Sequence, residues 1–566
     1  MLLALAFLMT SVAKSATPAD ELLRYVPSDV GFCFIARDLR AHGEALADSP
    51  FVAELRKNRS GEALVRSEEL ARLTRLEEQV QKQLGLDWEK LRTDILGDGI
   101  VFAYRPGPPG KPDEEEGLIL IRARGPKPIA DLVNRINEIQ KSSGEVKEVE
   151  ARTHRGLSYF CRLERDKSPS YYCLRGPVLL LSGNEAILLR ALDLEQSTPA
   201  AAEPAIAKQF RLLGADRAVL ALWLNPRAFD AHVDAKAKAQ APEAPAMQIF
   251  ERYWSALDGA AFYLDLAKDV SFSVAVRGRT DSLTPAAQRF FAEAARPSDL
   301  WQSFPERAMV AAAGRVNFAA LVEIASEFIP TDGKPALNEQ LNRTLGPPLG
   351  KNIVSDVLPC LGPDAGFCLY APDAKDKKWC PKGFAAVRIA AGDSAAPVDQ
   401  AVSAGIQTLA MLTVLGHNAK DPDHPLTLQT EIQDKRSVKY LTGEGVFPPG
   451  LQPAFGLHSG YLVIATSPDV LRTFSPQAAA AVPEGQPIPL FRLNLKQCRE
   501  YLRQNQESLS TALAEAHALK PEDVRSRLDT VTSTLELFDR LEISKRSAAG
   551  KATYTVRLQT ALPLQK

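Results

Sequence analysis

Side chains able to do chemistry are sparse in this sequence, and the densest group lies in the stretch HNAKDPDHP. His417, Asp421, Asp423 and His424 fall close together there, and imidazoles and carboxylates are ordinary ligands of a divalent metal ion. The same stretch fits a solvated turn after a helix, because Asn, Asp and Pro are turn-forming residues. We favour the turn, and we expect neither a metal nor another cofactor.

A nucleophile activated by a base is the second chemistry to consider. Ser459 directly follows His458. Neighbouring side chains on a strand point to opposite faces, so we expect that this histidine does not activate this serine. In an alternative interpretation the chain is an envelope hydrolase, and His154, His458 and Asp98 are then the first residues to inspect for shifted pKa values. The sequence assigns no catalytic residue.

The composition is that of an ordinary globular chain. Of its 566 residues, 45% are hydrophobic and 24% are charged, and 68 Lys and Arg oppose 69 Asp and Glu. A nucleic-acid-binding protein usually has a basic excess or a basic stripe, and neither is present. We therefore expect no nucleic-acid partner, whereas a ligand or a protein partner in the cell envelope stays open.

The N-terminus predicts export. Residues 1–16, MLLALAFLMTSVAKSA, form an apolar run followed by small residues, which is typical of a secretory signal peptide. The run is too short to span a bilayer, and a buried N-terminal helix is the alternative. We expect a periplasmic or extracellular protein that does not span a membrane after signal removal, with no later stretch of spanning length free of charges.

The chain has seven cysteines, of which two pairs bracket short segments that look like hairpins. An oxidising compartment would allow a disulfide between Cys161 and Cys173, and Cys368 and Cys380 bracket a second such segment. A direct cross-strand pair is somewhat wide for a relaxed bridge, so buried free thiols are the alternative.

The strands and helices that would position any site follow a pattern that occurs twice in the sequence. GPVLLLSGNEAILLRAL (176–192) and SGYLVIATSPDVLRTF (459–474) each contain an apolar run and then a helix start, with Asn184 or Ser467 placed to cap the helix. Their flanking elements recur in the same order, at an offset of roughly 265 to 283 positions. A chance match would not hold this offset over so many elements.

We therefore predict an α+β fold made by tandem duplication of two similar halves. Residues 17–300 form the first half and residues 301–566 the second, and each is expected to be a mainly antiparallel sheet with helices packed on one face. A groove between two such halves is a common place for a ligand.

Three stretches resemble a family of exported bacterial proteins, of planctomycete-like style, that contain a domain of unknown function. They are YVPSD (25–29), LGDGIVF (96–102) and LLLSGNEAIL (179–188). These motifs describe turns, caps and strands, so the resemblance implies export and fold and assigns no catalytic residue. Together these observations predict an exported soluble protein that binds or scaffolds in the cell envelope without catalysis.

Overall fold

The computed structural model describes residues 17–565, apart from short internal segments. The segments left out are 59–60, 64–65, 86, 166–168, 198, 200–201, 240–244, 330–338, 341, 344–349, 374–377, 390–394 and 434–435. The signal peptide predicted for residues 1–16 lies outside the described residues.

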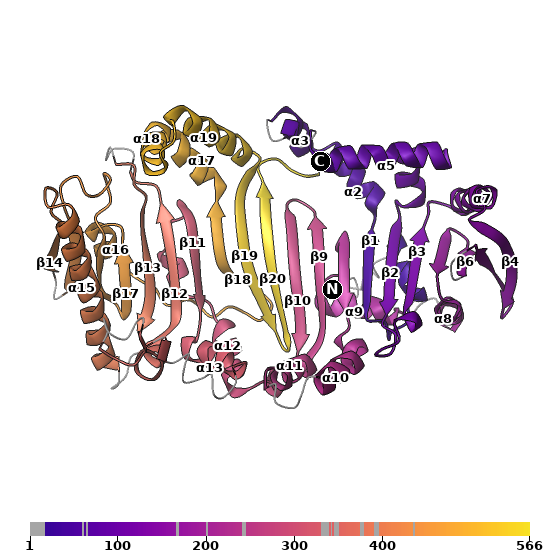
Figure 1. Ribbon diagram of the computed structural model, residues 1–566, viewed down its shortest axis with the longest axis horizontal. Helices are drawn as coiled ribbons and strands as arrows, with labels where there is room; N and C mark the ends of the chain where they lie inside the picture. The colour runs from indigo at the N-terminus through magenta and orange to yellow at the C-terminus, as the bar shows by residue number, and fades with distance from the viewer. Residues whose placement is uncertain are drawn as a thin grey trace, which may run out of the picture.

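Twenty strands of the described chain form one sheet (Figure 1). The first ten are β1 (Phe32–Arg37), β2 (Gly99–Arg105), β3 (Glu116–Arg122), β4 (Val146–His154), β5 (Leu157–Glu164), β6 (Ser170–Arg175), β7 (Val178–Ser182), β8 (Leu220–Leu224), β9 (Leu257–Leu266) and β10 (Val270–Gly278). The second ten are β11 (Ala308–Arg315), β12 (Leu361–Tyr370), β13 (Lys382–Ile389), β14 (Thr427–Gln433), β15 (Arg436–Thr442), β16 (Ala454–His458), β17 (Tyr461–Ala465), β18 (Pro487–Asn494), β19 (Phe538–Ala548) and β20 (Lys551–Thr560).

All strand pairings in this sheet are antiparallel. The first ten strands lie in the order β4-β5-β6-β7-β3-β2-β1-β8-β9-β10. The second ten lie in the order β14-β15-β16-β17-β13-β12-β11-β18-β19-β20. β10 pairs with β20, so the two sets form one continuous sheet, a junction that the sequence did not predict.

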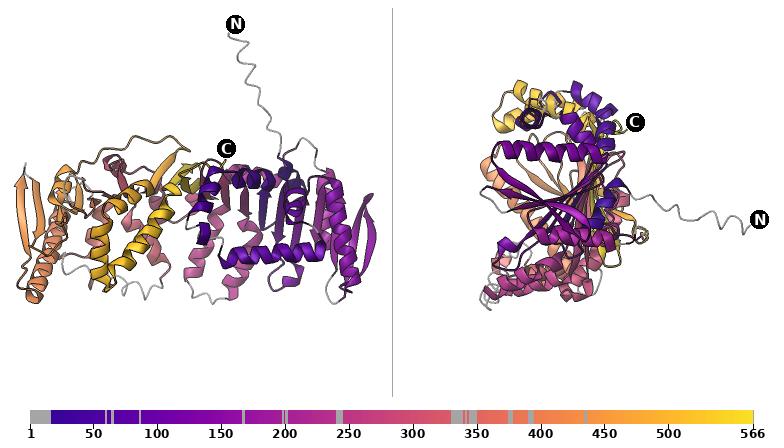
Figure 2. Two further views of the ribbon diagram at one scale, coloured as in Figure 1. Left: turned by 90° about the horizontal axis from the view of Figure 1, so that it is seen from above. Right: turned by 90° about the vertical axis from the view of Figure 1, so that its right-hand side faces the viewer.

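The helices lie along both strand ends and on both faces (Figures 1 and 2). Those of the first half are α1 (Pro18–Leu22), α2 (Leu39–Ala47), α3 (Pro50–Lys57), α5 (Glu68–Leu84), α6 (Trp88–Lys90), α7 (Pro126–Ser142), α8 (Glu185–Ser197), α9 (Ala205–Leu213), α10 (Asp230–Ala239), α11 (Pro245–Ala256) and α12 (Pro285–Ala294). Those of the second half are α13 (Phe318–Glu327), α15 (Ala395–Lys420), α16 (Pro468–Thr473), α17 (Leu495–Gln504), α18 (Gln506–His517) and α19 (Pro521–Leu535).

Both predicted helix caps are confirmed. The Asn184 carboxamide oxygen accepts a hydrogen bond from the Ala186 amide at 2.8 Å, at the start of α8. The Ser467 hydroxyl accepts one from the Val470 amide at the start of α16, where Pro468 occupies the first turn.

Helices cover both faces of the sheet, which corrects the expectation of helices on one face. We call the face covered by α8 and α9 the back face and the opposite one the front face. Adjacent residues of β7 make the division plain: Leu180 packs with α8 and α9, whereas Leu179 packs with α7. At the far end of the sheet α15 covers the front face and α16 the back face. Alternating apolar residues on both sides of the outer strands explain this double cover.

Candidate functional site: an open apolar face

The front face carries an unbroken row of apolar side chains across sixteen neighbouring strands. Direct cross-strand pairing aligns one residue from each strand, and residues paired in this way point to the same face. From β6 to β16 the row is Leu174, Leu179, Ile121, Ile100, Ala36, Leu220, Leu264, Phe272, Val556, Ile543, Phe491, Ala312, Phe367, Ala385, Ile464 and Phe455.

The two ends of this row are covered and its middle is open. Leu179 lies under α7 and is 3% exposed, and Phe455 near the other end is also buried. Between them Phe272 is 44% exposed, Phe367 40% and Ile464 50%. Exposed fractions of this size mean that no described helix covers these aromatic and aliphatic side chains.

Two further apolar rows flank the first one over the central strands. One contains Leu181, Ile119, Phe102, Phe34, Leu222, Phe262, Val274 and Tyr554. The other contains Leu266, Val270, Leu558, Leu541, Leu493, Val310 and Leu369. We call the three rows together the apolar front face. Exposed apolar patches of this extent mark interaction sites in soluble proteins.

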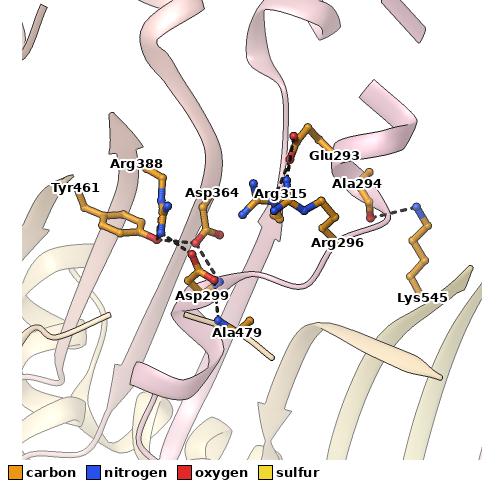
Figure 3. A network of polar contacts seen from close by, with 10 residues as sticks. All are labelled: Glu293, Ala294, Arg296, Asp299, Arg315, Asp364, Arg388, Tyr461, Ala479 and Lys545. Carbon is orange, nitrogen blue, oxygen red and sulfur yellow. Dashed lines mark hydrogen bonds and ion pairs between the residues drawn. The ribbon is translucent and has the colours of Figure 1, made fainter. Parts of the chain in front are cut away.

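A lysine follows Tyr554 in its row. Lys545 is buried, and its ammonium donates to the Ala294 carbonyl at 3.2 Å (Figure 3). The same ammonium lies 5.6 Å from the centre of the Tyr554 ring. Burial lowers the pKa of Lys545. Because helix α12 supplies the carbonyl that receives it, this lysine ties the end of α12 to the sheet.

At the junction between β10 and β20 the back face carries a polar pair within its apolar surroundings. Ser273 of β10 and Thr555 of β20 pair directly, and their hydroxyl oxygens lie 2.8 Å apart. Their neighbours Phe272 and Val556 point to the front. Alternation along these strands therefore directs the large apolar side chains away from the layer formed by α8 and α9.

A buried polar cluster lies on the back face of the second half (Figure 3). The Tyr461 hydroxyl donates to Asp364 at 2.7 Å, and Arg388 donates to the Tyr461 hydroxyl at 2.8 Å and to Asp299. Burial, and then the hydrogen bond to Asp364, raise the pKa of Tyr461. Asp364 and Tyr461 are fully buried, so this cluster fastens Asp299 and its short helix to the sheet.

The first half has a comparable cluster around Arg122. Its guanidinium lies 2.7 Å from Asp98 and 2.7 Å from Glu21, and Asp98 also pairs with Arg40. Asp98, one of the residues singled out for a hydrolase, is thus part of an ion-pair network that holds α1 to β3.

The two histidines singled out lie far from Asp98 in the strand order. His154 on β4 has Nε2 2.7 Å from a carboxylate oxygen of Asp193. His458 on β16 has Nδ1 3.2 Å from the hydroxyl of Ser459, so the expectation that these two side chains diverge is wrong. Ser459 has a φ of 54° in the turn after β16. The backbone is therefore not extended at this residue, and its side chain does not point to the face opposite His458 as it would in a strand. The three candidate residues do not form one site.

The candidate metal stretch is the last turn of α15, which contains His417, followed by a turn at residues 421–424. His417 lies 2.9 Å from the His424 carbonyl, and the His424 ring lies 3.2 Å from the Asp421 carboxylate. Within the part of the chain that the structure describes, no group of three or more His, Cys, Asp or Glu is placed to hold a metal ion.

The cysteines considered for a disulfide are free thiols in the structure. Cys161 pairs directly with Tyr171, which puts Cys173 two residues out of register, and Cys173 donates to the Ser158 carbonyl at 3.3 Å. A diagonal pair is wider than a disulfide permits, so this register does not place the two thiols for the bridge that the sequence left open. Burial raises the pKa of both thiols, to about 11 for Cys173. Cys368 and Cys380 are free thiols as well.

One described segment is long and apolar enough to cross a membrane by length and composition. It covers Val398–Lys420 within α15, and it corrects the expectation that no later stretch reaches this length without charges. Core helices of soluble proteins pass the same test, and Val398 and Val402 pack into the front-face core of the second half.

Comparisons with known proteins do not show a family for this chain. No family model matches the chain, and no curated protein matches it. A solved structure titled "Structure of crystal form III of TP0453" is similar at 11% identity and a TM-score of 0.23, covering 48% of this chain and 84% of that chain. A score this low carries no argument, and the resemblance to exported bacterial proteins stays a prediction.

Proposed function

We propose that this protein is an exported, non-catalytic binding protein that holds apolar chains, such as the acyl chains of a lipid, against its apolar front face. The observation that carries the proposal is the run of large apolar side chains left exposed at the centre of the sheet, among them Phe272, Phe367 and Ile464. Covering them would release water from apolar surface, which favours binding by about 25 cal/mol per Å².

The surroundings of the apolar front face favour a narrow, flexible ligand over a flat protein surface. Seen from above, the sheet forms one layer, and long helices, α5 and α19 among them, stand off it on the side where α7 and α15 lie (Figure 2). A second sheet would have to approach within about 10 Å to pack on this face. The projecting helices oppose that approach, whereas an acyl chain can lie between them.

The length of the open region also suits acyl chains. It runs from Ile119 on β3 to Ile464 on β17, and neighbouring strands are about 4.8 Å apart. Twelve such spacings give about 58 Å, which exceeds the hydrocarbon thickness of a bilayer, about 30 Å, that two acyl chains fill end to end. We therefore propose more than one chain per protein.

Export to the periplasm or the cell surface is part of the proposal and is supported by the predicted signal peptide of residues 1–16. In the periplasm or at the cell surface, a protein of this kind would hold lipid acyl chains away from water. A hydrolase is the alternative, but Asp98, His154 and His458 lie apart and bind other partners.

We infer that the two sets of ten strands arose by tandem duplication. Each set has the same strand order. At a constant offset between the halves, Phe272 corresponds to Tyr554, Ser273 to Thr555 and Val274 to Val556. At the junction Ser273 pairs with Thr555, flanked by Phe272 with Val556 and Val274 with Tyr554. Such reciprocal pairing is what a two-fold axis between two equal surfaces produces. Duplication would thus have doubled the length of the apolar front face.

Binding of a naturally fluorescent fatty acid, parinaric acid, to the mature chain tests the proposed function. The double variant Phe272→Glu with Val556→Glu places two carboxylates at the centre of the apolar front face. We expect at least tenfold weaker binding, which corresponds to about 1.4 kcal/mol. Arg546→Glu, an exposed back-face change on β19, is the matched control and should leave binding unchanged.

Phe272→Ser with Val556→Ser serves as a milder variant if the carboxylates disturb folding, which circular dichroism would reveal. No binding by the wild-type chain, or equal binding by a folded front-face variant, would overturn the proposal.

A further inference from the structure

The two helices that cover the front face at opposite ends of the sheet differ in their outer surfaces. α7 covers strands of the β4–β7 group, and α15 covers the corresponding β14–β17 group. The exposed side of α7 carries Lys127, Asp131, Arg135, Glu138 and Lys141. On α15, residues 400–419 contain no Asp, Glu, Lys or Arg. The position in the fold therefore accepts a charged outer surface, and α15 lacks one.

The outer side of α15 exposes large apolar side chains. Leu412 is 58% exposed and Leu415 62%, and Leu409 and Met411 are also exposed. The inner side holds the helix on the sheet through Val398, Val402 and Ile406. One side of α15 therefore packs against the sheet and stabilises the fold. The opposite side is also apolar, and no described part of the chain covers it.

The two threonine hydroxyl groups on α15 are satisfied within the helix. Thr408 donates to the Ala404 carbonyl at 2.9 Å, and Thr413 donates to the Leu409 carbonyl at 2.9 Å. A threonine bonded in this way does not depend on water, so it can enter an apolar medium at low cost.

The apolar surface continues onto the neighbouring edge strand. β14 packs beside α15, and its Ile432 is 75% exposed. Ile432 pairs with Ser437, two residues before Lys439, whose ammonium lies 2.6 Å from the Gln407 carboxamide oxygen of α15. Ile432 and Lys439 therefore point to the same side of the sheet as α15.

We propose that the outer side of α15, with Ile432, docks on the surface of a lipid bilayer. The uncharged residues 400–419 extend over about 30 Å of helix, and a face about 10 Å wide therefore offers at most about 300 Å². This area is less than half of what each partner contributes to a stable protein interface, about 800 Å², whereas a bilayer sets no such minimum and needs no matching shape. The absence of charge over residues 400–419 fits hydrocarbon better than a polar protein surface.

The helix would lie in the interface and would not span the bilayer, because its inner side is packed against the sheet. Attachment at α15 would place one end of the apolar front face beside the membrane. The inference does not depend on what that face binds.

Co-sedimentation with phosphatidylcholine vesicles tests the proposal on the mature chain. We expect the wild-type protein to bind, and 0.5 M NaCl or added anionic lipid to change binding less than twofold. Leu412→Glu with Leu415→Glu should weaken binding at least tenfold. Arg135→Glu on the outer side of α7 is the matched control and should bind as the wild type does.

Three outcomes would overturn the proposal. They are no vesicle binding by the wild-type chain, unchanged binding by a Leu412→Glu, Leu415→Glu variant that keeps its circular dichroism spectrum, and a wild-type dimer that this variant converts to a monomer. The last would assign the surface to a second copy. Parinaric acid binding should be unaffected by the α15 changes, so a failure here is distinguishable from a failure of the proposed function.

Discussion

The two faces of the sheet at its centre differ in what covers them. On the back face Phe210 of α9 is fully buried against the strands, in a core with Trp223 and Ala275. On the front face Phe272, which has the same size as Phe210 and lies two strands away from Trp223, is 44% exposed. The same residue type thus stabilises the fold on one face and is left exposed on the other. The difference shows that apolar side chains on one face of a strand do not by themselves indicate that another layer of the protein covers that face.

The largest expected effect tests this contrast directly. Phe210→Ala should lower the free energy of unfolding by about 3–5 kcal/mol, because it opens a cavity in a closed core. Phe272→Ala should lower it by less than about 1 kcal/mol, since the ring is already half exposed. Urea denaturation of both variants measures the difference. Equal losses would mean that the front face is covered in solution, and the contrast between the faces would then disappear.

A smaller effect sharpens the comparison between the two halves. Tyr461→Phe removes the hydroxyl that donates to fully buried Asp364, and should cost about 2–3 kcal/mol. Tyr159→Phe in the first half removes a similar bond, to Glu185 at 2.7 Å. Glu185 is one-third exposed and can bind water instead, so the expected cost is about 1 kcal/mol. Denaturation midpoints measure both, and a larger loss for Tyr159→Phe would contradict the burial argument.

Much of the fold could be predicted from the sequence because local signals were strong and repeated. The apolar runs of β7 and β17 and the caps at Asn184 and Ser467 are short-range features, and each lies where its pattern indicates. The turn after α15, residues 421–424, was also predictable, since Asp and Pro specify it locally.

Long-range features could not be predicted in this way. The pairing of β10 with β20 joins residues almost 300 positions apart, and alternation in VSFSVAVRG predicts a strand without saying what covers it. The register that separates Cys161 from Cys173 depends on the connection between β5 and β6. The candidate site was missed for the same reason, because its rows form only when sixteen strands lie side by side. The uncharged run of residues 400–419, by contrast, was visible in the sequence.

Photolabelling with a long-chain fatty acid that carries a terminal diazirine tests the central claim most directly. After irradiation of the wild-type protein, mass spectrometry locates the labelled residues. The account predicts labels on the exposed front-face residues of β10, β12, β17 and β20, which are Phe272, Phe367, Ile464, Tyr554 and Val556. Labels confined to back-face residues, or to α15 alone, would contradict it.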